Sequence, residues 1–284
     1  MSSAPDTSSI SFTALYTGQV WQRNGLSAPG FDTRKGRLLY RLLMPFEFVG
    51  GKLAGGNVRT FLLQRHHIID DLLSRAIREE GVTQVLEIAC GLSPRGYRFH
   101  LAHPELRYVE CDLPGMVSRK RHLLEKLGSL DERHLVTELN FLSDGEDGLE
   151  AVVARHFDTA QPLLVITEGL VNYFPLPVLD GFWRRLSRVM SGFPHAIYLT
   201  DNYPLLNDSP LRGTMETLSK LLATISRSDA NFHFGSDAET QEYLTERGFD
   251  AVTVHDPRDY YLRLPIPRSR GIPLVRVIEA RTGG

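Results

Sequence analysis

Small and acidic residues stand at the ends of several apolar segments of this sequence, where they could hold a ligand. The segment "QVLEIAC" contains Glu87 and Ala89 and runs into Gly91, and "RYVEC" is followed by Asp112. The segment "LLVIT" is likewise followed by Glu168. Small residues let a backbone turn approach a ligand closely, and an acid about twenty residues further along can accept hydrogen bonds from ribose hydroxyls. The pattern indicates a nucleotide-like ligand bound where strands end.

The same residues also admit purely structural interpretations. The turn lacks the pattern G-x-G-x-x-G, because Ala89 and Ser93 stand where further glycines would be. This disfavours a dinucleotide and leaves a plain strand-to-helix connection open. Asp112 precedes Pro114 and could instead cap the next helix. On the residues alone, both interpretations of each position remain open.

A regular alternation of strands and helices positions these residues. Short apolar segments predict parallel strands at 84–90, 107–112, 134–139, 163–169 and 196–201. Amphipathic segments between them predict helices from Pro94 and at 116–128, 148–157 and 178–190. This alternation predicts a doubly wound α/β sheet with helices on both faces. Ligands bind such sheets beyond the carboxyl ends of the strands, where the small and acidic residues stand.

The C-terminal part departs from this alternation. A helix is predicted at 236–248 with Ser236 as its cap, followed by strands at 250–256 and 273–280 with no helix between them. Two strands joined in this way predict an antiparallel hairpin at the sheet edge, which gives about seven strands in all. That finish is typical of the Rossmann-like class I methyltransferases rather than of dehydrogenases.

The opening of the chain predicts a helical cap on the same domain. Helical patterns occur in three segments of it, at 12–26, 33–53 and 57–81. Gly81 is the predicted stop of the last helix. We expect a single domain over 1–284, with the cap at 1–80 and the Rossmann-like core at 81–284. A lid insertion at about 202–235 is expected to roof the ligand site together with the cap.

Composition argues against several classes of function. The chain of 284 residues carries 32 basic and 34 acidic side chains, so it has no excess positive charge for nucleic acid or an anionic membrane. The start "MSSAPDTSSI" is polar, and no stretch approaches about 20 apolar residues, so neither an export signal nor a membrane span is expected. The two cysteines, Cys90 and Cys111, fit a reducing cytoplasm and predict neither a disulfide nor a metal site.

Taken together, the motifs carry a resemblance to a known family. "VLEIACGLSPRGYRF", "YVECDLPGMVSRKR" and "VITEGLVNYFP" occur in the order and spacing of the leucine carboxyl methyltransferase superfamily. "TALYTGQVWQRNGLS" resembles the bacterial polyketide O-methyltransferase branch of the tetracenomycin type. The resemblance covers nearly the whole chain from about Phe12. It implies a class I fold that binds S-adenosylmethionine and methylates an oxygen, commonly a carboxylate, of a small molecule or of a protein C-terminus.

The resemblance also implies a cofactor site, position by position. Arg65 in "LLQRHHIIDD" matches an arginine that pairs with the methionine carboxylate, which suits a planar guanidinium, although a solvated helix face is its alternative. Gly91 matches the turn beneath the methionine moiety, Asp112 the ribose ligand and Glu168 the acid near the amino group. Asn140 falls where many relatives have an aspartate beside the adenine. The full predicted cofactor set is Arg65, Glu87, Ala89, Gly91, Asp112, Leu113, Asn140, Phe141, Glu168 and Gly169.

Aromatic and polar residues near this site are candidates for the acceptor side. An aromatic face can hold the cofactor's sulfonium by cation–π attraction, although such residues are more often plain packing. We predict a substrate side made of Tyr16, Trp21 and Asp201, and positioning roles for Tyr173, Tyr203 and Arg212, the last holding an acidic group.

The sequence does not identify a general base. His66, His67, His233 and His255 are candidates, but the pattern places no orienting partner beside any of them. A phenol or alcohol must lose a proton before methylation, whereas a carboxylic acid is already ionised near neutral pH. We therefore expect a carboxylate as acceptor, with a hydroxyl as the alternative, and the resemblance implies that it belongs to a small polyketide-like acid. A catalytically silent, methyltransferase-like binding protein also stays open, because glycines are missing at Ala89 and Ser93.

Overall fold

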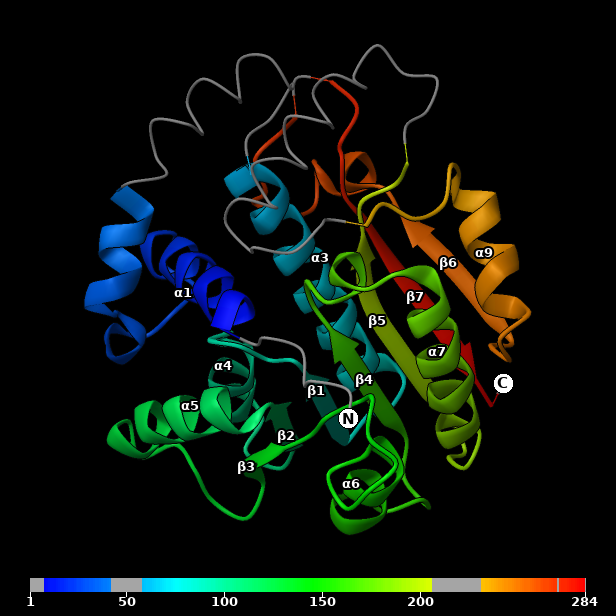
Figure 1. Ribbon diagram of the computed structural model, residues 1–284, viewed down its shortest axis with the longest axis horizontal. Coiled ribbons are helices and arrows are strands. Elements are labelled where there is room, and N and C mark those ends of the chain that lie inside the picture. Colours follow the sequence, from blue (N-terminus) through cyan, green and yellow to red (C-terminus); the bar gives the residue numbers. More distant parts are fainter. Residues whose placement is uncertain (1–7, 42–57, 206–230, 270, 284) are drawn as a thin grey trace.

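The computed structural model describes residues 8–41, 58–205, 231–269 and 271–283, and its centre is a seven-stranded sheet (Figure 1). The strand order is β3-β2-β1-β4-β5-β7-β6. The strands are β1 (Gln84–Ile88), β2 (Arg107–Asp112), β3 (His134–Glu138), β4 (Leu163–Thr167), β5 (Ala196–Asn202), β6 (Ala251–His255) and β7 (Arg276–Thr282). Strands β1 to β5 pair in parallel, and β7 is antiparallel to both β5 and β6. The predicted class I sheet with an antiparallel edge is confirmed.

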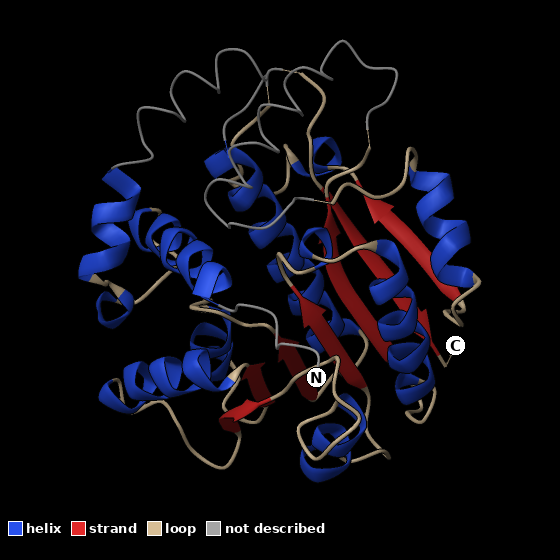
Figure 2. Cartoon of the chain, viewed as in Figure 1, coloured by secondary structure: helices blue, strands red, loops and turns tan. Residues whose placement is uncertain are grey.

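Helices cover both faces of this sheet (Figure 2). They are α1 (Ser8–Arg23), α3 (Val58–Glu79), α4 (Arg95–Ala102), α5 (Pro114–Lys126), α6 (Leu149–His156), α7 (Leu176–Met190) and α9 (Asp237–Thr245). Short 3-10 turns are η1 (Pro29–Phe31), η2 (Val171–Tyr173) and η3 (Pro257–Tyr260). Helices α3 and α4 pack on one face, and α6, α7 and α9 pack on the other. Because both faces are covered, β1, β4 and β5 are buried along their whole length, whereas the edge strand β6 is half-exposed.

Helix α3 leads directly into β1 and carries residues toward the strand ends. Its apolar side chains, Ile68, Ile69, Leu72, Leu73 and Ala76, recur at helical spacing and pack against the sheet. The helix ends as predicted at Gly81, whose φ of +69° is readily adopted by glycine. The cap on Ser236 is also confirmed, because its side chain accepts a hydrogen bond from the Glu239 amide.

The N-terminal cap packs over the same edge of the sheet. Helix α1 and a helical segment at 34–41 form an apolar cluster with α3, which also includes Leu92 and Met116 next to the first strand ends. The second predicted cap helix is thus helical over its first part, and its remainder at 42–53 lies outside the described residues. Within the described ranges, we find no helix with the length and apolar character that crossing a membrane requires.

Candidate functional site

The strand order reverses between β1 and β4, and the ends of these strands form the floor of a cavity. Its free volume is about 70 Å³. Eight of the residues predicted from the sequence line it: Trp21, Arg65, Ala89, Gly91, Asp112, Glu168, Gly169 and Tyr173. Seven further lining residues were missed by sequence reasoning: Ala14, Thr17, Cys90, Leu92, Met116, Leu170 and Phe174. Residues predicted at several strand ends therefore meet in one cavity, and helix α1 forms one side of it.

Asp112 closes the β2 side of the cavity. Its Oδ2 accepts a hydrogen bond from the Gly91 amide at 2.8 Å, and its Oδ1 accepts one from the Leu113 amide at 2.8 Å. The N-cap of α5 is Leu113 and has no side-chain cap bond, so the helix-cap interpretation of Asp112 is not the one the structure adopts. Burial raises the pKa of Asp112, and the two amides only partly oppose this. The Asp112 carboxyl group is therefore shielded from water and accepts hydrogen bonds from two backbone amides.

The turn between β1 and α4 has a left-handed backbone at two positions. Gly91 has φ of +52°, and a Cβ there would lie 3.3 Å from the Ala14 Cβ, so a glycine lets helix α1 come close. Ala89 has φ of +54°, which is a strained conformation for a residue with a Cβ. Ala89 thus adopts a conformation that suits glycine, although no glycine is there.

Arg65 of α3 closes the β4 side. Its Nε donates to Glu168 Oε1 at 3.1 Å and its Nη1 donates to Asp201 Oδ2 at 2.8 Å. A Cβ on Gly169 would lie 2.7 Å from Nη2, so only glycine allows the guanidinium to approach this turn. Burial opposes the charge of Arg65, but Asp201, Tyr203 and Glu168 outweigh it and raise its pKa. The solvated-face alternative for Arg65 is excluded by its 6% exposure.

Glu168 is already occupied by cationic and histidine neighbours on α3 and α4. Its Oε2 accepts from Arg95 Nη2 at 2.6 Å and lies 2.8 Å from His66 Nδ1. Burial raises the pKa of Glu168, but His66, Arg95 and Arg65 lower it well below its ordinary value. Glu168 lines the cavity, yet its charge is chiefly engaged in holding these side chains.

Arg95, which follows the predicted helix start at Pro94 and was given no role, is the centre of this buried network. It is 0% exposed and also pairs with Asp70 at 2.6 Å and with Glu87 at 2.7 Å. Glu87 additionally accepts from the Tyr108 hydroxyl at 2.6 Å. Glu87 therefore lies beneath the turn and outside the cavity lining, and its contact with the cofactor stays a prediction. No strand or helix pattern in the sequence indicated this network, because its acids lie on α3, on β1 and after β4 and meet only in the fold.

Three other predicted cofactor residues also lie outside the cavity lining. Asn140 and Phe141 follow β3, where Asn140 Oδ1 accepts from the Leu142 amide and the Phe141 ring packs edge-on against Phe174 at 4.9 Å. Phe141 thus lies one layer behind the cavity. Leu113 contributes its amide to Asp112 and does not line the cavity.

Of the residues predicted for the acceptor side, Trp21 and Tyr173 line the cavity, and the others that the structure describes do not. Tyr16 does not line the cavity, because it points into the cap and stacks on Tyr40 with ring centroids 6.0 Å apart. Asp201 is buried behind Arg65. Tyr203 is buried against Phe61, Leu274 and Val275. Arg212 lies outside the described residues.

The four candidate histidines do not line this cavity. His66 is fully buried in the Arg95 network, and burial lowers its pKa. His233 lies 3.0 Å from the Phe174 carbonyl oxygen through Nε2. His255 does have an acidic partner, Glu279 at 3.0 Å, but on the strands β6 and β7 at the other end of the sheet.

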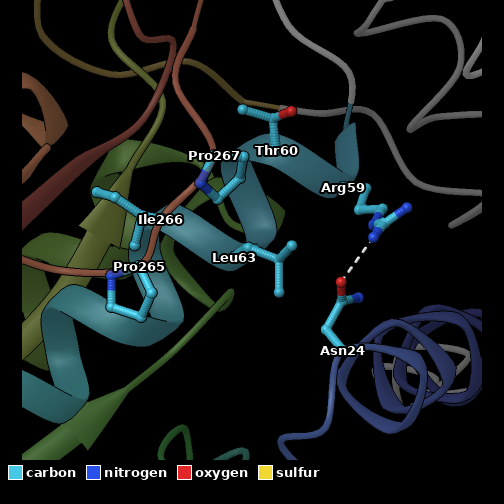
Figure 3. Close-up of a pocket in the computed structure, with 7 residues that line it drawn as sticks. All are labelled: Asn24, Arg59, Thr60, Leu63, Pro265, Ile266 and Pro267. Carbon is cyan, nitrogen blue, oxygen red and sulfur yellow. Dashed lines mark hydrogen bonds between the residues drawn. The ribbon is translucent and has the colours of Figure 1, made fainter.

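A second cavity, of about 480 Å³, lies between the end of α1, the start of α3 and a C-terminal loop (Figure 3). Arg59 Nη2 donates to Asn24 Oδ1 across its mouth at 2.6 Å. The remaining lining residues are Thr60, Leu63, Pro265, Ile266 and Pro267. It shares no residue with the strand-end cavity, so it is a separate feature of the surface.

Comparison with sequence families agrees with the motifs. A family model described as leucine carboxyl methyltransferase matches residues 49–180, a span that includes Arg65, Gly91, Asp112 and Glu168. The resemblance to this family predicted from the sequence is confirmed. The polyketide branch stays a prediction.

Two bacterial relatives share moderate identity with the chain. A candidate S-adenosyl-L-methionine-dependent methyltransferase of Mycobacterium sp. (strain JLS) is 29% identical over 212 residues, covering 70% of this chain and 66% of that protein. One of Mycolicibacterium gilvum (strain PYR-GCK) is 29% identical over 225 residues, covering 76% and 71%. The matched part is thus about two thirds of the first relative's length.

Solved structures agree with the fold. A candidate methyltransferase from Thermobifida fusca has a TM-score of 0.66 at 15% identity and covers 98% of this chain and 95% of its own. A DUF574 family protein from Streptomyces avermitilis has a TM-score of 0.65 at 14% identity, covering 96% and 99%. PigF, solved with SAH, has a TM-score of 0.52 at 14% identity, covering 95% and 68%. At these identities the comparison shows a shared fold.

Proposed function

We propose that this chain, which resembles the leucine carboxyl methyltransferase family in sequence and methyltransferases in fold, is an S-adenosylmethionine-dependent O-methyltransferase acting on a small carboxylic acid. The observation that carries the proposal is the meeting of Arg65, Gly91 and Asp112 around one cavity at the strand-order reversal. The relatives' names and the SAH in PigF support the same cofactor.

The residues around the cavity fit this cofactor in their chemistry. The left-handed glycine turn at Gly91 leaves room beside β1, and Asp112 offers carboxylate oxygens whose remaining lone pairs can accept from ribose hydroxyls. Arg65 offers a guanidinium edge for the methionine carboxylate, held in place by Glu168 and Asp201. Acid, arginine and glycine turn are the donor and acceptor types that such a ligand requires.

When bound, S-adenosylmethionine supplies a methyl group that is already attached to a good leaving group. The task left to the chain is to fix orientation and exclude water. Trp21 and Tyr173 present aromatic side chains to the cavity, and Leu170 and Phe174 add apolar surface. These side chains suit a sulfonium and the apolar body of an acceptor.

The surroundings favour an acceptor that needs no base. Among the described residues, the histidines lie outside the cavity lining, and the two lining acids, Asp112 and Glu168, are held by hydrogen bonds. An acceptor carboxylate is ionised near neutral pH and can attack without proton transfer. Within the described ranges, a phenol or alcohol in this cavity meets no lining histidine that could take its proton.

One observation favours the alternative of a catalytically silent binding protein. The cavity of about 70 Å³ is much smaller than the roughly 300–1,000 Å³ usual for small-molecule sites. A ligand of the cofactor's size therefore fits only if side chains that line the cavity move apart. A catalytically silent protein that binds a different ligand or partner needs no such movement.

Calorimetric titration with S-adenosylmethionine, its demethylated product and NAD separates these functions. We expect saturable binding of the first two and none of NAD. Enzyme and cofactor incubated with a panel of small acids and their hydroxyl analogues should then give products heavier by one methyl group among the acids. Binding of NAD alone would overturn the proposal, and the absence of any binding would favour the silent protein.

A further inference from the structure

Three separate chain segments meet beside the ends of β4 and β5, and Asn172 of η2 lies at their centre. The segments are 171–174, 202–205 and 231–234. None of the sequence motifs assigned a role to Asn172, because nothing local distinguishes it from an ordinary turn residue. Its contacts join residues thirty and more positions apart.

Both ends of the Asn172 amide are used. Its Nδ2 donates to the Asn231 carbonyl at 2.5 Å and to Asn202 Oδ1 at 3.3 Å, and its Oδ1 accepts from the Tyr203 amide at 3.1 Å. The Asn172 carbonyl also accepts from the Asn231 amide at 2.9 Å. Only a side chain that both donates and accepts at this length can make all of these side-chain bonds. We call Asn172, Asn202, Asn231 and His233 the asparagine clasp.

Further hydrogen bonds close the clasp on its outer side. Asn202 Nδ2 donates to the His233 carbonyl at 3.0 Å, and His233 Nε2 lies 3.0 Å from the Phe174 carbonyl oxygen. Asn202 is 1% exposed and His233 is 6% exposed, so water is not a ready substitute for these partners. His233 thus has a structural position that its predicted status as a possible base did not anticipate.

The clasp joins the two segments that carry Tyr173 and Tyr203. Tyr173 follows Asn172 in the chain and lines the strand-end cavity. The backbone amide of Tyr203 donates to Asn172 Oδ1, and this hydrogen bond fixes the backbone at Tyr203. Asp201 directly precedes Asn202 and accepts from Arg65 Nη1 at 2.8 Å, and Tyr173 lines the cavity together with Arg65. Moving either segment therefore changes the surroundings of the group assigned to the methionine carboxylate.

We propose that Asn172 is a positioning residue for the amino-acid end of the cofactor, because it fixes the segments that place Tyr173 and Asp201 beside Arg65. This inference rests on the proposed function, since it assigns the methionine moiety to the Arg65 side. The adenosine side, at Asp112 and Gly91, shares no hydrogen bond with the clasp. Loss of Asn172 should then weaken contacts to one end of the ligand only.

Two ligands that differ at that end test the inference. Calorimetric titration of the full chain and of Asn172→Leu would use S-adenosylmethionine and 5′-methylthioadenosine, which lacks the amino acid. We expect the leucine variant to bind S-adenosylmethionine about five- to tenfold more weakly, as for one or two lost hydrogen bonds, and to bind methylthioadenosine like the parent. Asn172→Asp keeps the acceptor for the Tyr203 amide, so its affinity for S-adenosylmethionine should lie between those of the parent and Asn172→Leu. Gln241→Leu on the exposed side of α9 is the matched control and should change neither.

Each outcome bears on one proposal. Suppose that the parent chain binds both ligands. If Asn172→Leu then weakens the binding of both equally, or weakens the binding of neither, the positioning role is overturned and the proposed function stands. If the parent binds neither ligand, the proposed function itself fails. Should Asn172→Leu not fold, as judged by circular dichroism, the same pair of titrations on Asn172→Asp decides the question.

Discussion

Asp112 at the end of β2 and Glu168 at the end of β4 are two cavity carboxylates in opposite surroundings. Asp112 accepts from two backbone amides, whereas Glu168 contacts two guanidinium groups and an imidazole. Burial raises the pKa of Asp112, while its charged neighbours lower the pKa of Glu168 despite burial. One side of the cavity is thus made by the backbone and the other by a network of charged side chains. The two sides should respond differently to mutation, acid and ligand truncation.

Removing the centre of the charged side should have the largest effect. Arg95→Met leaves Asp70, Glu87 and Glu168 without their shared guanidinium, in a place where Arg95 is 0% exposed. An unpaired buried charge typically costs about 3–5 kcal/mol, so the free energy of unfolding from urea titration should fall by that amount. The control Arg184→Met removes an exposed ion pair with Asp180 and should cost less than about 1 kcal/mol. Equal losses in the two variants would contradict the central role of Arg95.

Lowering the pH should destabilise the folded chain through the same network of charged side chains. The pKa values of Glu168 and Asp70 are lowered in the fold, so the stability they contribute is present above their ordinary values of 4.5 and 3.8 and is lost as pH falls. His66 has a lowered pKa, so below its ordinary 6.5 the unfolded chain binds the proton more readily. All three shifts have the same sign, so the melting temperature should decline first below pH 6.5 through His66 and further below pH 4.5 and 3.8 through Glu168 and Asp70.

Asp112 has the opposite sign and provides the control. Its raised pKa means that the folded chain holds this proton more readily, so acid does not remove stability through Asp112. Asp112→Asn removes this opposing contribution, so its melting temperature by scanning calorimetry should decline at least as steeply as that of the parent. A melting temperature that stays constant from pH 7 to well below 3.8 would show that the charged network does not govern stability.

Ligand truncation separates the two sides functionally. Asp112→Ala should weaken S-adenosylmethionine and 5′-methylthioadenosine alike, by roughly 1–3 kcal/mol, because both ligands carry the ribose. Arg65→Ala should weaken S-adenosylmethionine by a similar amount and leave methylthioadenosine unchanged, because only the former has a carboxylate. Titration calorimetry on the two variants measures this directly. The reverse pattern would mean that the cofactor lies in the other direction along the strand ends.

The same contrast explains what could be predicted from the sequence. Gly91 and Asp112 were found because their roles depend on strand ends, a periodic pattern and a spacing of 21 residues. Arg95 was not found, because its partners are 25, 8 and 73 residues away and only the packing of α3 and β4 brings them together. Asn172 was not predicted for the same reason. Networks of charged and amide side chains depend on tertiary distances, which a strand pattern does not contain.

The cap shows a second kind of limit. Tyr16 and Trp21 were both predicted to face the ligand, but they lie on different faces of α1. Ala14, Thr17 and Trp21 line the cavity at a spacing of three and four residues, so one face of the helix is involved. Given Trp21, this periodicity identifies Thr17 and excludes Tyr16. The sequence alone did not say which face of α1 turns toward the sheet.

The smallest expected effect concerns the backbone side, at Ala89. Ala89→Gly relieves a φ of +54°, worth roughly 1–2 kcal/mol, but it also gives the unfolded chain more freedom, worth about 0.4–1 kcal/mol. The free energy of unfolding should therefore rise by about 0.5 kcal/mol in urea titration. Ala160→Gly, at an exposed turn with an ordinary φ, has only the entropic term and should lose stability. The two substitutions are chemically identical, so opposite signs would isolate the backbone strain in the turn. Matching losses would mean that the surroundings of Ala89 accommodate its Cβ without strain, and that the missing glycine has no energetic consequence for this site.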